Sequence, residues 1–97
     1  MYKILIFLKK TGDDSVLLRF TNSTVPKLES LTKDKIKLAA IEGAALSEEK
    51  YSLYCEASFP KKEDLDMLMQ SPEGKELNKD LAGYGSHISV FYANFGE

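Results

Sequence analysis

The sequence has little of several features that define whole classes of protein. Among its 97 residues there is one cysteine, Cys55, and one histidine, His87. A lone cysteine cannot form an internal disulfide, so the fold must be stabilised without one. One histidine and one distant cysteine have no recognisable metal-ligand spacing, so we expect no metal site and no bound cofactor.

Long apolar runs and an excess of positive charge are also missing. The apolar run after Lys3 ends at Leu8, which is too short for a signal peptide or a membrane span. Thirteen Lys and Arg residues against fifteen Asp and Glu residues give a formal net charge of −2, which offers no basic footprint for nucleic acid or an anionic membrane. We therefore expect a cytoplasmic protein that binds neither nucleic acid nor membranes.

What the sequence does contain is typical of one globular domain, spanning residues 1–97. Hydrophobic residues make up 43% and charged residues 29% of the chain, too apolar a composition for a disordered protein. A domain of this size buries only roughly 60 to 65% of its unfolded surface. Association with a second copy would supply the missing burial.

Residues 2–8 predict a strand, because they are rich in β-branched and aromatic residues and precede the charged turn 9–13. The even positions are apolar, and Leu5 and Phe7 on the other face are apolar too. Both faces of the sheet are therefore expected to be covered, one of them by a second subunit.

Residues 14–31 predict a helix, since their apolar residues fall on one helical stripe and Asp13 or Asp14 can cap the first turn. Pro26 lies inside this helix, removes a backbone donor and restricts the residue before it. We therefore expect a kink at residues 22–24.

Residues 33–46 are ambiguous, because their apolar residues fit both a helical and an alternating spacing. Propensity favours a helix, whereas Gly43 and the short distance to the next strand favour a strand. We predict a strand here, the second of the sheet.

Residues 51–59 alternate apolar and polar side chains, which predicts a third strand that Pro60 ends. A short helix over 62–69 follows. Ser71 and Pro72 then suit the N-cap and the first position of a restarted helix.

The restarted helix is expected to end at Gly83, and residues 87–95 to form the fourth strand. The predicted order is therefore strand, helix, strand, strand, helix, strand. This order defines an α+β, ferredoxin-like βαββαβ fold, with an antiparallel four-stranded sheet and two helices on one face.

Several segments together carry a family resemblance. The most specific element is the Ser-Pro-Glu-Gly motif at 71–74, which a helix and a final Val-Phe-Tyr strand at 90–92 follow; further matches lie at 2–10, 22–28 and 65–81. In these segments the chain resembles the ethyl tert-butyl ether degradation (EthD) family of dimeric α+β barrel proteins. The likeness spans nearly the whole chain.

The resemblance implies a homodimer whose two sheets face each other as a barrel, with a cleft between sheet and helices in each subunit. Relatives with this fold include monooxygenases, lyases, isomerases and haem-degrading enzymes, so the fold alone does not select a reaction. The family often has a histidine two positions before the proline of the first helix, and this chain has Thr24 there. A proton-shuttling role of that histidine therefore does not carry over.

His87 and Tyr92 are the candidate catalytic residues. His87 is the only imidazole for acid or base chemistry near neutral pH, although a partly exposed histidine after a glycine-rich turn is the explanation that we favour. The Tyr92 phenol can reach a cleft, but an ordinary tyrosine at the edge of the core is the explanation that we favour.

The third strand contains three residues whose roles depend on burial. Cys55 is expected in the core rather than as a nucleophile, because nothing nearby lowers its pKa. Tyr54 and Glu56 take the opposite register, where Glu56 is either paired with a lysine, which we favour, or a perturbed carboxylate.

The predicted ligand-binding residues are Asn22, Thr24, Tyr54 and Tyr92. Asn22 and Thr24 lie at the expected kink, where they either bind a ligand or satisfy carbonyl groups freed by Pro26, the role that we favour. The Thr24 side chain is expected to point towards the sheet near Tyr92. An RNA-binding function is rejected, because residues 51–59 contain no arginine, lysine or glycine.

These observations predict a small homodimeric protein with a cleft between sheet and helices for a small apolar or aromatic metabolite, and a binding or accessory role. The alternative is an enzyme without a cofactor, either an oxidoreductase of the monooxygenase type or a lyase or isomerase of the same superfamily.

Overall fold

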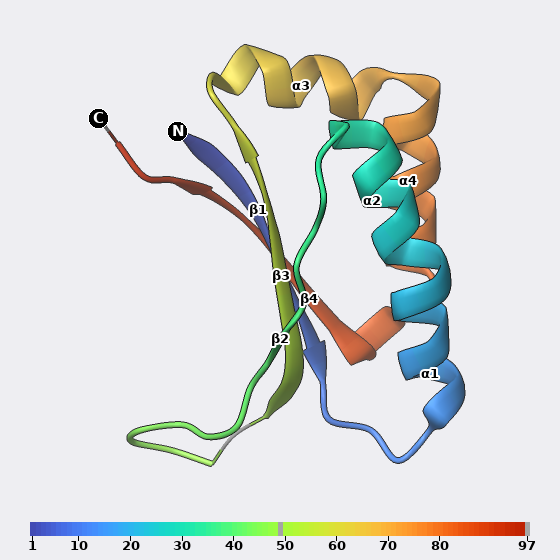
Figure 1. Ribbon diagram of the computed structural model, residues 1–97, viewed down its shortest axis with the longest axis vertical. Helices are drawn as coiled ribbons and strands as arrows, with labels where there is room; N and C mark the ends of the chain where they lie inside the picture. The colour runs from blue at the N-terminus through green and yellow to red at the C-terminus, as the bar shows by residue number, and fades with distance from the viewer. Residues whose placement is uncertain (49, 97) are drawn as a thin grey trace.

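The computed structural model describes residues 1–48 and 50–96. Four antiparallel strands form one sheet with the order β2-β3-β1-β4, and the helices pack against one of its faces (Figure 1). The predicted ferredoxin-like fold is therefore confirmed. The elements are β1 (Tyr2–Lys9), α1 (Asp14–Arg19), η1 (Phe20–Thr24), α2 (Val25–Thr32), β2 (Ala39–Ala40), β3 (Tyr51–Phe59), α3 (Lys62–Gln70), α4 (Pro72–Ala82), η2 (Gly85–His87) and β4 (Ile88–Asn94).

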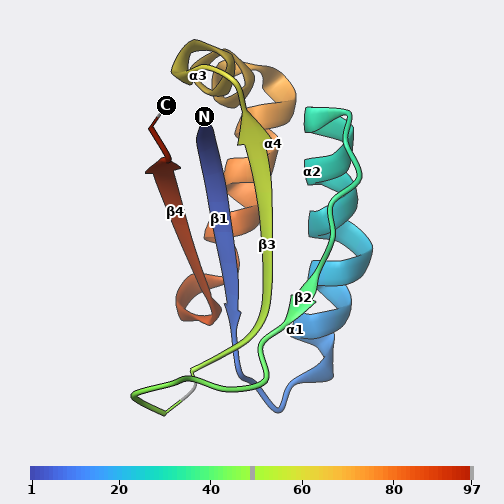
Figure 2. The ribbon, with the colours of Figure 1, turned by 60° about the vertical axis from the view of Figure 1, so that its left-hand side comes forward.

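Strand β1 lies between β3 and β4, and its side chains alternate between the two faces of the sheet. Its residues Ile4, Ile6 and Leu8 are almost completely buried under the helices. Leu5 and Phe7 point to the opposite face, which the helices leave uncovered (Figure 2). The two-sided apolar character of this strand thus leaves one apolar face that no helix of residues 1–48 and 50–96 covers.

The first helical segment contains a π-helical turn where a kink was predicted. Asp13 caps α1, and its side chain accepts a hydrogen bond from the Ser15 amide. In η1 the Val25 amide donates to the Phe20 carbonyl, five residues earlier. Pro26 has no N–H to donate, so regular α-helical bonding cannot run through this point.

The second helical segment is broken at Ser71, as predicted. The Ser71 hydroxyl donates to the Leu68 carbonyl and accepts from the Gly74 amide, so one side chain ends α3 and caps α4. A Cβ atom on Gly74 would lie 1.9 Å from the Leu68 carbonyl oxygen, so only glycine permits this close approach.

The prediction of a strand over 33–46 is wrong for most of its length, because β2 comprises only Ala39 and Ala40. Lys33 adopts the left-handed conformation at the end of α2, with a φ of 63°. The Glu29 carboxylate then accepts a hydrogen bond from the Ile36 amide at 2.9 Å. These two features turn the chain away from β3 before the strand begins.

The C-terminal strand is also shorter than predicted. His87 belongs to the 3₁₀ turn η2 and donates its amide to the Tyr84 carbonyl, so β4 begins at Ile88 rather than at 87. Gly83 caps α4 as predicted, with a right-handed φ of −66°. None of the helices in the described part of the chain is long and apolar enough to cross a membrane.

Candidate functional site

The helix-free face of the sheet carries an aromatic cluster, which we define as Phe7, Tyr51, Tyr54 and Phe91. The Phe7 ring lies at its centre, with centroid distances of 4.7 Å to Tyr54, 5.2 Å to Tyr51 and 5.9 Å to Phe91. Phe91 remains 52% exposed. An apolar surface of this kind on a sheet is typical of a protein interface.

A polar group lies beside the aromatic cluster on the same face. Tyr54 donates a hydrogen bond to Glu56 at 2.5 Å, and the Lys3 ammonium donates to the other carboxylate oxygen at 3.0 Å. The hydrogen bond from Tyr54, followed by that from Lys3, lowers the pKa of Glu56. Burial, with the Glu56 hydrogen bond, raises the pKa of Tyr54 to about 12. Tyr54 therefore stays a donor and Glu56 an acceptor at neutral pH.

A cavity of about 820 Å³ lies at the β2 edge of the sheet. One wall is formed by β3 residues, which include Tyr54, Glu56 and Ser58. Residues 34–38, which connect α2 with β2, and Ala39 at the start of β2 form the other wall. The Lys3, Tyr54 and Glu56 group thus lies where the helix-free face meets this cavity.

A second cavity, of about 390 Å³, lies on the covered side of the sheet. It is lined by the side chains of Tyr2 in β1, Leu65 and Met69 in α3, and Tyr92 in β4, with Lys62 and Asp66 among its polar neighbours. Tyr92 is paired with the buried Ile4, which places its ring on the helix side. This cavity is a cleft between sheet and helix, of the kind that the family resemblance implied.

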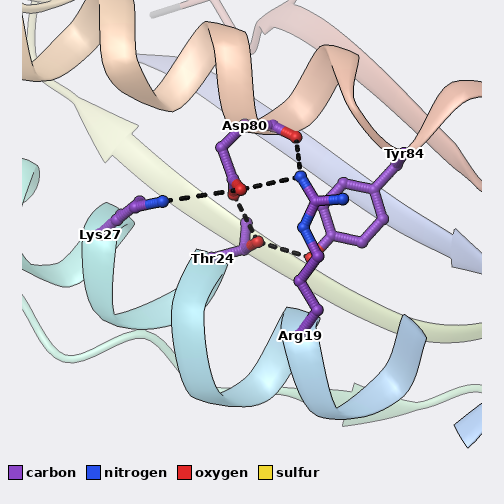
Figure 3. A network of polar contacts seen from close by, with 5 residues as sticks. All are labelled: Arg19, Thr24, Lys27, Asp80 and Tyr84. Carbon is purple, nitrogen blue, oxygen red and sulfur yellow. Dashed lines mark hydrogen bonds and ion pairs between the residues drawn. The ribbon is translucent and has the colours of Figure 1, made fainter. Parts of the chain in front are cut away.

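The two helical segments are joined by a polar network centred on Asp80 (Figure 3). The Asp80 carboxylate accepts hydrogen bonds from Arg19 at 2.9 Å and Thr24 at 2.6 Å, and the Lys27 ammonium lies 3.6 Å away. The Tyr84 hydroxyl lies 2.6 Å from that of Thr24. Since Thr24 gives its one proton to Asp80, Tyr84 is the donor to Thr24.

The π-helical turn explains why three side chains meet at one carboxylate. In a regular α-helix, residues five apart differ by about 140° in direction, because each residue turns about 100°. Arg19 and Thr24 have this spacing, and the wider turn of η1 brings both to Asp80. Lys27 follows Thr24 by three residues and lies on the same side.

The network also determines the charge of its members. Burial would raise the pKa of Asp80, but the hydrogen bonds from Thr24 and Arg19 and the charges of Lys27 and Arg19 outweigh it and lower that pKa. Burial raises the pKa of the Tyr84 phenol. The Arg19 guanidinium stacks 4.1 Å above the Tyr84 ring. Asp80 is thus a largely buried carboxylate whose partners favour its ionised form.

The structure does not bring the four predicted ligand-binding residues together. Tyr54 lies on the helix-free face and Tyr92 on the covered face. Thr24, expected near Tyr92, instead has its hydroxyl between Asp80 and Tyr84. Asn22 is exposed in η1. Their roles in ligand binding stay predictions.

The other candidate residues have the surroundings that we favoured from the sequence. Cys55 is 1% exposed, and burial, followed by the charge of Glu56, raises the pKa of its thiol to about 11. The predicted lysine partner of Glu56 is Lys3. His87 is exposed on the 3₁₀ turn, and a catalytic role for it stays a prediction.

No pattern in the sequence indicated the network around Asp80. Arg19 and Asp80 are 61 residues apart, and no short-range spacing connects them. The one local signal was Pro26, which indicated an irregular helix but not which side chains the irregularity would bring together.

Comparison with known proteins supports the fold. A structure of an EthD family protein from Bacillus halodurans has a TM-score of 0.83, with 22% identity over 99% of both chains. A hydroxynitrile lyase from Passiflora edulis has a TM-score of 0.71, with 16% identity over 99% of this chain and 94% of that one. A dimeric ferredoxin-like protein of unknown function from Jannaschia has a TM-score of 0.70, with 15% identity over 96% and 97% of the chains.

No protein-family model and no curated protein sequence matches the chain. The resemblance to the EthD family, inferred from the sequence, is confirmed at the level of the fold. The chain therefore has a ferredoxin-like fold that is similar to that of an EthD family protein, and one of the similar structures is described as dimeric.

Proposed function

We propose that this chain is a single-domain homodimer that binds a small apolar or aromatic metabolite in the cavity between the sheet and α3. The observation that carries the proposal is the cavity itself. Its volume of about 390 Å³ falls within the range of small-molecule sites, roughly 300 to 1,000 Å³. Two aromatic rings, Tyr2 and Tyr92, contribute to its lining.

The chemistry of the lining selects the ligand class. Leu65, Met69 and the two tyrosine rings present apolar surface, and a thioether adapts to irregular ligand shapes. Lys62 and Asp66 supply one cation and one anion, so a polar substituent can be oriented at one end. A planar apolar molecule with one oxygenated group fits this arrangement. The cytoplasm is the proposed location.

The test uses two methionines of the same helix. Thermal-shift screening of small aromatic and oxygenated compounds should give hits that calorimetry confirms on the wild-type protein. Met69→Ala should weaken such a hit about tenfold, because truncation removes apolar contact worth about 1.4 kcal/mol. Met67→Ala is the matched control, since Met67 is 73% exposed and does not line the cavity.

Two variants of Tyr92 measure separately what its ring and its hydroxyl contribute to binding. Tyr92→Ala should weaken binding as Met69→Ala does, whereas Tyr92→Phe retains the ring and reveals the contribution of the phenol. If Met69→Ala and Met67→Ala bind every hit equally, the proposed site is wrong.

A further inference from the structure

The pairing of β2 with β3 stops after two residues, although β3 continues. Ala39 is opposite Tyr54, Ala40 is opposite Leu53, and the Ile41 amide donates to the Ser52 carbonyl. Towards the N-terminus of β2, the chain leaves β3 and forms the far wall of the 820 Å³ cavity. The edge of β3 beyond Tyr54 therefore borders this cavity rather than a neighbouring strand.

Continuing the register of β2 would place complementary side chains opposite each other. Lys37 would be opposite Glu56 on the helix-free face, where an opposite-charge pair is favourable. Ile36 would be opposite Ala57, which is 3% exposed on the covered face. Two residues of one segment thus fit both faces of the sheet, with the charged one outward and the apolar one inward.

The backbone groups fit the same register. Ile41 with Ser52 and Ala39 with Tyr54 are hydrogen-bonding pairs, and such pairs recur at every second residue of an antiparallel ladder. The next such pair would be Lys37 with Glu56. The Ile36 amide would then point away from β3. Closure therefore does not require a new partner in β3 for this amide, which donates a hydrogen bond to Glu29.

We propose that residues 35–38 form a strap that closes onto the edge of β3 and eliminates the cavity. In the closed state β2 is extended by four residues, and Lys37 joins Lys3 at the Glu56 carboxylate. In the open state Tyr54 and Glu56 line an accessible cavity. The strap therefore controls the approach to this polar group from the β2 edge of the sheet, which is separate from the cavity beside α3.

The first test traps the closed state with a disulfide. In a Cys55→Ala background, the variant Ile36→Cys/Ala57→Cys places two thiols at a non-hydrogen-bonded pair of the closed register, where side chains lie close enough to bridge. Diamide oxidises the two thiols, taking up two electrons and two protons as the sulfur–sulfur bond forms. Lys35→Cys/Ala57→Cys is the matched control, because its thiols would lie on opposite faces of the sheet.

We expect the first variant to cross-link at least tenfold faster than the control, as measured by mass spectrometry under non-reducing conditions. Equal rates in two folded variants would overturn the proposal. Amide hydrogen exchange of the wild-type chain does not depend on whether the variants fold. Closure predicts slower exchange at Lys37 than at Leu38, whose amide points away from β3, and equal exchange at these two positions overturns it.

Discussion

Asp80 shows how one residue can hold two helical segments together. Its carboxylate is 9% exposed and has partners from α1, η1 and α2. A buried carboxylate without partners would be strongly unfavourable, but here two cations and a hydroxyl compensate for lost hydration. The network is therefore expected to contribute to stability at pH values where Asp80 is ionised.

The pH dependence of stability tests this role. The pKa of Asp80 is lowered in the folded state, so its contribution is complete above the unfolded value of 3.8 and is lost as pH falls through the folded pKa. Asp80→Asn should cost about 1 to 3 kcal/mol of unfolding free energy at pH 7, the loss expected for hydrogen bonds to a charged group. In urea denaturation, the difference in unfolding free energy between Asp80→Asn and the wild type should become smaller as the pH falls from 7 to 2.

The control for this measurement is Glu76→Gln, since Glu76 is an exposed carboxylate in the middle of α4, away from both helix ends. Its stability should follow that of the wild type at every pH. If the difference in unfolding free energy between Asp80→Asn and the wild type stays constant across the acid range, ionisation of Asp80 does not stabilise the fold.

Residue-level predictions from the sequence succeeded where a side chain's surroundings follow from strand alternation. Cys55 in the core and Glu56 beside a lysine both follow from the period of two in β3. Thr24 was placed towards the sheet, near Tyr92, because the effect of a π-helical turn on side-chain direction is not visible in a sequence. Its partner Asp80 is 56 residues away, and only tertiary structure determines that contact.

At the scale of elements, the junction of α3 and α4 depends on a single hydroxyl. Ser71→Ala removes both the cap of α4 and the bond to the Leu68 carbonyl, and should cost about 1 kcal/mol. Glu73→Ala should cost less, because an exposed acid near a helix N-terminus contributes only about 0.3 to 1 kcal/mol. Chemical denaturation of both variants measures the difference, and equal, negligible effects would contradict the capping role.

The strength of the sequence signal explains which elements were predicted well. The bounds of β3 match the prediction, because apolar and polar residues alternate over most of its length and Pro60 ends it. The register shift opposite Leu8 and Lys9, which brings Tyr51 to the same face as Tyr54, has no sequence signal. The segment 33–46 has apolar residues that fit two spacings, and its path is determined by Lys33 and by the carboxylate of Glu29. The outcome there depends on a contact between segments rather than on local propensity.

At the scale of the molecule, the helix-free face predicts a homodimer. No helix of the described residues covers this face of the sheet (Figure 2), which carries the aromatic cluster, and a similar structure from Jannaschia is described as dimeric. Light scattering after size exclusion at low micromolar concentration should give about twice the chain mass of 10.9 kDa.

Two lysine substitutions identify the face that forms the dimer. Phe91→Lys places a charge in the aromatic cluster and should give the monomer mass, because a buried unpaired ammonium opposes association. Met67→Lys changes an exposed apolar residue of α3 and should remain dimeric. A wild-type monomer, or a dimer that survives Phe91→Lys, would contradict an interface on this face.

The π-helical turn has a consequence for how this chain can change over evolutionary time. The turn contains one residue more than α-helical bonding would need, so deleting a residue within η1 would leave both flanking helices intact. It would also rotate α1 relative to α2, and Arg19 and Thr24 would no longer share Asp80. We therefore expect the length of η1 and the acid at position 80 to change together in related chains, because a chain without the extra residue gains nothing from keeping the acid.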